Sequence, residues 1–147
     1  MADLQRFAYF AKFISTRFVA PRVFDVAGGM GKLNCELSAL GHQVVTFDKR
    51  HKHLPVEYAQ RAFTLAEPCC ADMVVGMHPD GATQVIIEYA ALHRIPFAVV
   101  PCCSDNGLSY KDWMRFLASK AASLGFGDVA EGMLPMRGRA RVLHGRF

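Results

Sequence analysis

Residues 23–33 read VFDVAGGMGKL and residues 41–48 read GHQVVTFD, and these two runs decide the expected fold. An apolar run that ends in glycines predicts a buried strand followed by a tight turn. Glycine lets the backbone pass close to a ligand, because a Cβ atom would clash there. The second run predicts another strand, and it ends on the carboxylate of Asp48, which can accept hydrogen bonds from the hydroxyls of a ribose. Together the two runs predict a binding site for a cofactor that contains a nucleoside.

The spacing of the glycines separates several kinds of turn. A P-loop needs a serine or threonine after its Gly-Lys pair, but Gly31-Lys32 is followed by Leu33. A dinucleotide-binding turn needs the pattern Gly-x-Gly-x-x-Gly, and a start at Gly29 puts Asn34 in the place of the third glycine. The sequence therefore disfavours both of these kinds.

Residues 25–31, DVAGGMG, fit another pattern, which is Asp, a hydrophobic residue and then Gly-x-Gly-x-Gly, with Ala27 in place of the first glycine. This turn resembles motif I of the class I S-adenosylmethionine (SAM)-dependent methyltransferases. In that family the turn cradles the methionine part of the cofactor, and the acidic residue after the second strand holds the ribose. The resemblance implies that SAM is the cofactor and that it is bound by Asp25, Ala27, Gly28, Gly29, Gly31, Asp48 and Met77.

The rest of the chain alternates helical and strand patterns. We expect helices at residues 7–18, 32–40, 83–92 and 110–124, and strands at residues 23–26, 43–47, 72–77 and 96–101, with a short edge strand near 61–65. Helices between strands imply a mostly parallel sheet that is covered on both faces. Residues 137–144 alternate basic and apolar side chains in part, which predicts a final antiparallel hairpin. The expected fold is a single α/β domain over residues 1–147, a Rossmann-like class I methyltransferase sandwich with this hairpin at its C-terminal end.

Two further runs extend the resemblance beyond the turn. Residues 75–78 read VGMH and residues 96–103 read PFAVVPCC. They are similar to motifs in a branch of eukaryotic methyltransferase-like proteins that is related to a tRNA ribose 2′-O-methyltransferase. Asp80 departs from that branch, which often has a cysteine before the glycine. The sequence lacks the Asn/Asp-Pro-Pro-Tyr/Phe motif of amino methyltransferases, so methylation of an exocyclic amine is less expected.

The loops after these strands carry the candidate catalytic residues His78, Asp80 and Cys102, because ligands of such sheets lie beyond the carboxyl ends of the strands. Histidine has an ordinary pKa that suits a general base near neutral pH. Asp80 would orient this histidine or hold a substrate group. Alternatively, His78 and Pro79 shape the loop and meet the cofactor through their backbone, and Asp80 is structural.

Four of the five cysteines stand in the adjacent pairs Cys69-Cys70 and Cys102-Cys103. Cys102 occupies a place similar to that of the nucleophile in RNA 5-methylcytosine methyltransferases, where attack needs a lowered thiol pKa. The two pairs could instead bind zinc together with His78, but adjacent cysteines lack the two-residue spacer of common zinc sites, so no metal site is predicted. Packing of Cys102 and Cys103 as small buried residues is the remaining alternative.

The odd number of cysteines, with adjacent pairs that rarely bridge, favours a reducing compartment. We therefore expect an intracellular, cytoplasmic protein, with an organellar presequence in residues 2–19 as the alternative. No apolar run approaches the roughly 20 residues that span a bilayer, so no membrane contact is expected.

The charge pattern concerns the substrate. The formal net charge is +4, and basic residues gather in the loop Lys49–His53 and at Arg137, Arg139 and Arg141. Arginine suits bidentate phosphate contacts, so this rim is a candidate surface for RNA as a partner. The alternatives are a solvated basic face and arginines that protect the sheet edge from pairing. The predicted function is that of a SAM-dependent methyltransferase acting on tRNA or rRNA. The alternatives are a catalytically inactive SAM-binding or assembly subunit, for which a protein partner supplies substrate recognition, and a NAD-binding oxidoreductase.

Overall fold

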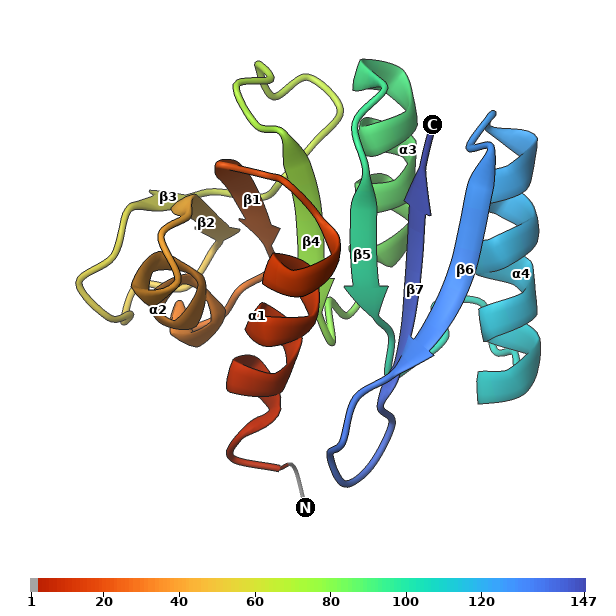
Figure 1. Ribbon diagram of the computed structural model, residues 1–147, viewed down its shortest axis with the longest axis horizontal. Coiled ribbons are helices and arrows are strands. Elements are labelled where there is room, and N and C mark those ends of the chain that lie inside the picture. The colour runs from red at the N-terminus through yellow and green to blue at the C-terminus, as the bar shows by residue number, and fades with distance from the viewer. Residues whose placement is uncertain (1–2) are drawn as a thin grey trace.

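A computed structural model describes residues 3–147, which form one seven-stranded sheet with helices on both faces (Figure 1). In chain order the elements are α1 (Arg6–Arg17), β1 (Arg22–Val26), α2 (Lys32–Ala39), β2 (Gln43–Asp48), β3 (Tyr58–Gln60), β4 (Met73–Met77), α3 (Thr83–His93), β5 (Phe97–Val100), α4 (Tyr110–Ser123), β6 (Asp128–Met133) and β7 (Arg141–Arg146). Helices α1 and α2 cover one face, and α3 and α4 cover the other. No helix in this described part is long and apolar enough to cross a membrane.

The strand order across the sheet is β3-β2-β1-β4-β5-β7-β6. Strands β1 to β5 run parallel, whereas β7 is antiparallel to both β5 and β6. The order reverses between β1 and β4, and sheets of this kind bind ligands in the crevice outside the carboxyl ends of the strands at such a switch point. The predicted mostly parallel sheet with a C-terminal antiparallel hairpin is confirmed, and the switch point lies at the glycine turn.

The central strands explain the long apolar runs of the sequence. Every residue of β4 and β5 is buried, because both faces of these strands are covered. In β4, Val75 packs in the cluster under α1 and α2, while Val74 packs under α3 and α4. In β5, Val100 and Val99 divide in the same way. These strands are therefore held from both sides, and their ends provide a firm base for the loops that follow.

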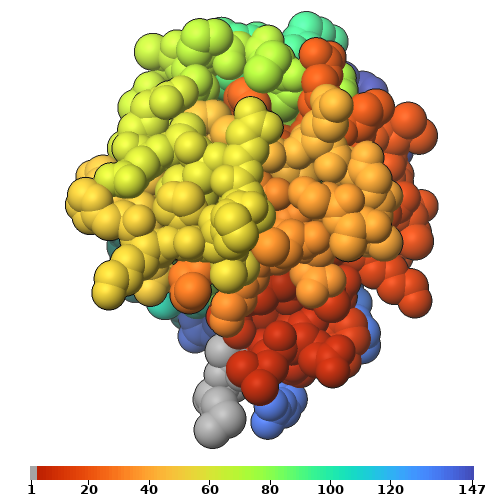
Figure 2. Space-filling view, turned by 90° about the vertical axis from the view of Figure 1, so that its left-hand side faces the viewer, coloured from red at the N-terminus to blue at the C-terminus, as the bar shows by residue number. Residues whose placement is uncertain are grey.

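The edge strand expected at residues 61–65 is wrong, because β3 is formed by Tyr58–Gln60, which pairs with β2. Arg61 instead forms an ion pair with Glu67, at 2.9 Å between Nη2 and Oε2. Phe63 packs against the rings of Phe24 and Phe47. The apolar character of this segment therefore serves packing over the edge of the sheet, and Figure 2 shows the segment that follows β2 lying beside α2 on this side of the molecule.

The C-terminal hairpin is present, but its bounds differ from residues 137–144. Its strands are β6 and β7, and residues 137–140 form part of the connection between them. The first strand escaped the sequence pattern because its apolar positions do not alternate clearly. A Cβ atom on Gly132 would lie 2.6 Å from a ring carbon of Phe13, so α1 packs directly on this strand. Pairing with β7, together with contact from the distant helix α1, makes this segment a strand.

Candidate functional site

The glycine turn between β1 and α2 is built around close approach. A Cβ atom on Gly28 would lie 2.3 Å from Oδ2 of Asp25, so no larger residue fits without a shift. Ala27 and Gly29 have φ angles of 55° and 58°, in the left-handed region that favours glycine. A non-glycine residue there stores strain of about 1–3 kcal/mol, which is typical of binding sites. The turn therefore gives up local stability to bring its backbone close to the cavity.

Asp25 is a fully buried carboxyl group with an unused acceptor. Its Oδ2 accepts a hydrogen bond from Oγ1 of Thr46 at 2.9 Å, and Thr46 in turn accepts one from Nδ2 of Asn34 at 3.1 Å. The other oxygen, Oδ1, is buried without a hydrogen-bond partner among residues 3–147. Burial raises the pKa of Asp25 to about 7, with a smaller contribution from the charge of Asp48, while the Thr46 bond lowers it. A buried acceptor without a donor points to a ligand that completes it.

Asp48 lies at the end of β2, beside the same turn. Its Oδ2 accepts a hydrogen bond from the Gly29 N–H at 2.9 Å, and its Oδ1 accepts one from the Arg50 N–H at 3.2 Å. A carboxylate has about four acceptor positions, so Asp48 keeps capacity for a ligand. The hydroxyl of Tyr58 also donates to the Gly29 carbonyl at 2.5 Å. These contacts fix the turn against the end of β2.

Two cavities lie on either side of the turn, and Ala27 lines both. The first has a volume of about 310 Å³ and is lined by Asp25, Met77 and His78 together with the cations Arg6, Lys32 and Arg50. The second has a volume of about 400 Å³ and is lined by Asp48 and Asp80 with the apolar side chains Phe47, Phe63 and Val85. The first cavity carries three cations, and the second combines Asp48, Lys49 and Asp80 with two phenyl rings. Together they can take a ligand with a charged end and an aromatic ring.

His78 follows β4 directly and has a φ angle of 49°. Its backbone N–H donates to the Val100 carbonyl at 2.8 Å, and its Nε2 lies 3.2 Å from the carbonyl oxygen of Arg139. Since a carbonyl only accepts, Nε2 carries the proton in this contact and Nδ1 keeps a free lone pair. Burial lowers the pKa of His78, so the ring is neutral at neutral pH. The geometry therefore leaves His78 able to accept a proton.

Asp80 and Cys102 meet each other rather than His78. The Cys102 thiol donates to Oδ1 of Asp80 at 2.9 Å, so the contacts of the described residues give Asp80 no orienting bond to the His78 ring. Burial, followed by the bonds to Asp80 and Cys103, raises the pKa of Cys102 to about 12. The thiol therefore keeps its proton at neutral pH, and these surroundings disfavour its expected role as a thiolate nucleophile.

The two cysteine pairs do not form one zinc site. Among residues 3–147, the group of potential metal ligands that lies close together contains Cys102, Cys103 and Asp80, without the Cys69-Cys70 pair or His78. All five cysteines of the chain are free. The set considered from sequence is therefore wrong in its members, because Cys69 and Cys70 precede β4 at the amino end of the parallel strands, whereas Cys102 and Cys103 follow β5 at the carboxyl end.

Sequence reasoning missed several residues that line the site or support it. Arg6 and Phe7 line the first cavity because α1 packs on α2, and nothing in the local sequence around them signals this. A weak signal existed for Thr46, a polar residue within an apolar strand. In the sheet it is the direct neighbour of Asp25, so the two polar residues meet across β1 and β2.

The fold is similar to that of solved methyltransferases. Human N-acetylserotonin methyltransferase in complex with SAM gives a TM-score of 0.62 at 17% identity, covering 97% of this chain and 51% of that one. Magnesium protoporphyrin IX methyltransferase from Synechocystis PCC 6803 with bound SAM gives 0.63 at 16% identity, covering 95% and 76%. The glycopeptide N-methyltransferase MtfA complexed with SAM gives 0.67 at 12% identity, covering 95% and 93%. The sequence matches no protein-family model and no curated protein.

The chain therefore has the Rossmann-like fold of class I SAM-dependent methyltransferases. It spans about half the length of N-acetylserotonin methyltransferase, of which it covers 51%. At identities of 12–17%, the likeness defines the architecture and leaves the substrate open. The particular relation to a tRNA 2′-O-methyltransferase is not among these similarities.

Proposed function

We propose that the protein binds SAM and transfers its methyl group to RNA. The observation that carries the proposal is the buried, unpaired Oδ1 of Asp25 beneath a strained glycine turn, with the carboxylate of Asp48 on the other side of that turn. This arrangement lies at the switch point of the sheet, where ligands of this fold bind.

The two cavities match the two halves of SAM. Oδ1 of Asp25 would accept a hydrogen bond from the amino group of the methionine part, and Arg6, Lys32 and Arg50 supply positive charge for its carboxylate. In the second cavity Asp48 would hold the ribose, and the rings of Phe47 and Phe63 offer an apolar surface for the adenine. Bound there, SAM supplies an activated methyl group.

His78 is the residue that we propose as the general base. Methyl transfer is an in-line displacement, in which the enzyme positions the acceptor and removes its proton. The neutral ring with a free Nδ1 suits this role, and His78 lines the first cavity beside Met77. Asp80 remains a candidate for holding a substrate group, whereas Cys102 with its raised pKa is the weakest of the predicted catalytic residues.

RNA remains our proposed substrate class because cations flank the site on both sides. The loop Lys49–His53 follows β2, and its Arg50 lines the first cavity. Arg139 precedes β7 and Arg141 is its first residue. Both guanidinium groups lie over the Tyr110 ring, at 4.5 Å (Arg139) and 5.7 Å (Arg141) from its centre. Arg137 forms an ion pair with Asp3, at 3.9 Å between Nε and Oδ2, so it attracts an anionic ligand less strongly than an unpaired arginine would. The similar structures are methyltransferases of N-acetylserotonin, magnesium protoporphyrin IX and a glycopeptide, so the RNA proposal rests on this chain's own charges.

Two other functions are compatible with parts of this arrangement. A SAM-binding protein without turnover, which completes its substrate site with a partner subunit, would use the same cavities. NAD binding is disfavoured by the topology of the sheet. The dinucleotide fold has the strand order 3-2-1-4-5-6, whereas here the antiparallel β7 lies between β5 and β6. A cytoplasmic location stays a prediction from the free cysteines.

The proposal is tested first by calorimetric titration with SAM, S-adenosylhomocysteine and NAD. We expect saturable binding of the first two and none of NAD. Replacing Asp48→Ala should weaken binding of S-adenosylhomocysteine by about 1–3 kcal/mol, the range for losing hydrogen bonds to a charged group. Asp128→Ala is the control, because Asp128 is exposed on β6 and lines neither cavity. Equal affinity in both variants would remove Asp48 from the site.

The substrate class needs a separate measurement. The purified protein is incubated with total RNA and with SAM that carries a radiolabelled methyl group. We expect label in the macromolecular fraction that ribonuclease releases and protease does not. Binding of SAM with no labelled RNA would favour the non-catalytic alternative or another acceptor, and binding of NAD alone would overturn the cofactor.

A further inference from the structure

A cluster of metal-ligating groups lies next to the proposed methyl-transfer site. Asp80 stands in the turn between β4 and α3, and Cys102 and Cys103 follow β5. Oδ1 of Asp80 is 2.9 Å from Sγ of Cys102, which is 3.6 Å from Sγ of Cys103, and all three atoms lie within 4.8 Å of one another. Within residues 3–147, no other three such side chains gather this closely.

The spacing of these atoms fits a tetrahedral ion. With Zn–S distances of about 2.3 Å and Zn–O distances of about 2.1 Å, tetrahedral angles put two sulfurs about 3.8 Å apart and a sulfur and an oxygen about 3.6 Å apart. The two sulfurs are already 3.6 Å apart. Oδ1 of Asp80 is 2.9 Å from Sγ of Cys102, which is shorter than the distance that a shared zinc ion requires. The Asp80 side chain is exposed, so it can move back by this difference.

The sheet holds the two loops in register. Met77 and Val100 are paired neighbours at the ends of β4 and β5. Beyond them, the His78 N–H donates to the Val100 carbonyl at 2.8 Å, and the Asp80 N–H donates to the His78 carbonyl at 2.9 Å. These backbone hydrogen bonds hold the loop that carries Asp80 next to the loop that carries Cys102 and Cys103. This preorganisation is what a binding site requires.

We propose that Asp80, Cys102 and Cys103 bind one Zn²⁺ ion through three protein ligands and leave its fourth position open. Two cysteine sulfurs and one carboxylate form a donor set that suits zinc, which accepts both sulfur and oxygen. Three protein ligands with an exchangeable fourth position are typical of zinc sites that bind a further molecule. Asp80 and Cys103 are exposed, and Asp80 also lines the second cavity, so the ion lies at the rim of that cavity.

Charge is consistent with this assignment. Binding of the dication would release the thiol protons of Cys102 and Cys103 to solvent, and its charge would offset the repulsion among the three anionic ligands. Arg139 lies close by, since its Nη1 donates to the Cys102 carbonyl. This contact places a positive group beside the three ligands without occupying any ligand atom.

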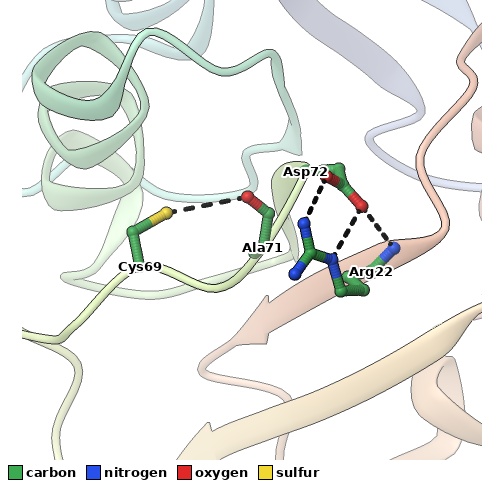
Figure 3. A network of polar contacts seen from close by, with 4 residues as sticks. All are labelled: Arg22, Cys69, Ala71 and Asp72. Atoms are coloured by element: carbon green, nitrogen blue, oxygen red, sulfur yellow. Dashed lines mark hydrogen bonds and ion pairs between the residues drawn. The ribbon is translucent and has the colours of Figure 1, made fainter.

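The chain offers a matched control in its other cysteine pair. Figure 3 shows that Cys69 contacts the Ala71 carbonyl, at 3.6 Å, while the neighbouring Asp72 is held by Arg22. Cys69 and Cys70 are therefore adjacent cysteines whose nearby carboxylate is already engaged. They test whether any adjacent pair binds zinc or whether the arrangement with Asp80 is required.

The experiment is a zinc titration of the reduced, full chain, with a competing chromophoric chelator and a count of free thiols before each run. We expect one Zn²⁺ per chain, and cobalt in its place should give thiolate-to-metal charge-transfer absorption. Cys102→Ser and Cys103→Ser should each weaken zinc binding by more than about tenfold, because loss of a mere outer partner of a ligand already costs 10–100-fold. Asp80→Asn should weaken it too, and Cys69→Ser and Cys70→Ser should leave it unchanged.

Several results would overturn the site. These are no zinc bound at micromolar concentration by protein with its thiols reduced, no thiolate band with cobalt, or an equal loss of affinity in the Cys69→Ser and Cys70→Ser controls. Thermal unfolding of each variant shows that it is folded. Titration of the Cys102→Ser and Cys103→Ser variants with S-adenosylhomocysteine separates this inference from the proposed function, because neither cysteine lines the two cavities.

Discussion

The carboxylates at the two ends of strands β1 and β4 differ in how many hydrogen-bond donors they have. At the amino end, Asp72 accepts hydrogen bonds from the backbone N–H, Nε and Nη2 of Arg22, at 2.9, 3.2 and 3.0 Å (Figure 3). The side-chain bond from Arg22 is the main cause that holds the pKa of Asp72 below its ordinary value. At the carboxyl end, Asp25 has one donor, Thr46, and burial raises its pKa to about 7.

This difference supports the proposal that the ligand site lies at the carboxyl end of these two strands. At the amino end, Arg22 pairs with the carboxylate of Asp72, so this carboxylate already has its hydrogen-bond donors within the protein. The carboxyl end leaves Oδ1 of Asp25 unpaired and holds Ala27 and His78 at positive φ angles. Unsatisfied and strained groups persist only where the surrounding structure imposes them, and they gather at functional sites. The comparison therefore predicts effects on ligands at one end and effects on stability alone at the other.

The largest expected effect is on turnover, from a change at His78. His78→Asn keeps a residue that tolerates the left-handed backbone but removes the base, so methyl transfer should fall by about 10²–10⁴-fold. The affinity for S-adenosylhomocysteine should fall far less than the rate, because His78 is one of several residues that line the first cavity. The amino-end counterpart is His42, which lies between Oγ of Ser15 and the Ala20 carbonyl. His42→Gln should leave the rate per folded molecule unchanged, and equal losses in both variants would remove His78 from the chemistry.

The next effect is a pH dependence of stability that arises from Asp25. Its folded pKa of about 7 lies above the ordinary value of 3.8, so its stabilising contribution is complete below pH 3.8 and is lost as the pH rises to about 7. Since one pKa unit corresponds to about 1.4 kcal/mol, this loss amounts to at most about 4 kcal/mol. Denaturant unfolding between pH 4 and 7 measures it, and Asp25→Asn should flatten the profile. A variant profile parallel to the native one would mean that another group is responsible.

A smaller loss of stability is expected from filling the glycine turn. The added Cβ of Gly28→Ala would strike Oδ2 of Asp25 at 2.3 Å and Cγ2 of Thr46 at 2.6 Å, and both side chains are buried. Overpacking of this kind costs about 1–3 kcal/mol, and the shifted turn should also lose S-adenosylhomocysteine binding. Gly127→Ala is the control, because its Cβ would meet nothing within 4 Å. Full cofactor binding by Gly28→Ala would show that the turn does not contact the ligand.

The smallest effect belongs to the amino end. Asp72→Asn weakens a partly exposed ion pair, and such pairs contribute little. The loss in unfolding free energy should therefore be smaller than that of Gly28→Ala, with no change in cofactor affinity. Because the folded pKa of Asp72 is depressed, its contribution is present above the ordinary carboxyl pKa and is lost as the pH falls through the folded value. A drop in cofactor affinity would break the distinction between the two ends.

The site could be predicted to the extent that it is local in sequence. The residues of the turn, from Asp25 to Gly31, and Asp48 lie where the pattern of glycines and strands predicts them, because turn chemistry and strand periodicity are properties of neighbouring residues. The sequence pattern puts strand β3 and the hairpin a few residues away from their positions in the structure, since these segments are chosen by pairing with β2, by pairing between β6 and β7, and by packing under α1. Short edge strands carry too little local pattern to set their own bounds.

The sequence by itself determined the alternation of helices and strands, the glycine turn and the acidic residues on its two sides. Only the tertiary structure decided that Arg6 reaches the first cavity, that Thr46 meets Asp25, and that Asp80 joins Cys102 and Cys103 instead of the other cysteine pair. It also decided the raised pKa of Asp25, which requires burial. The physical reason is that backbone conformation follows from adjacent residues, whereas desolvation and contacts between loops arise only after the sheet has brought distant segments together.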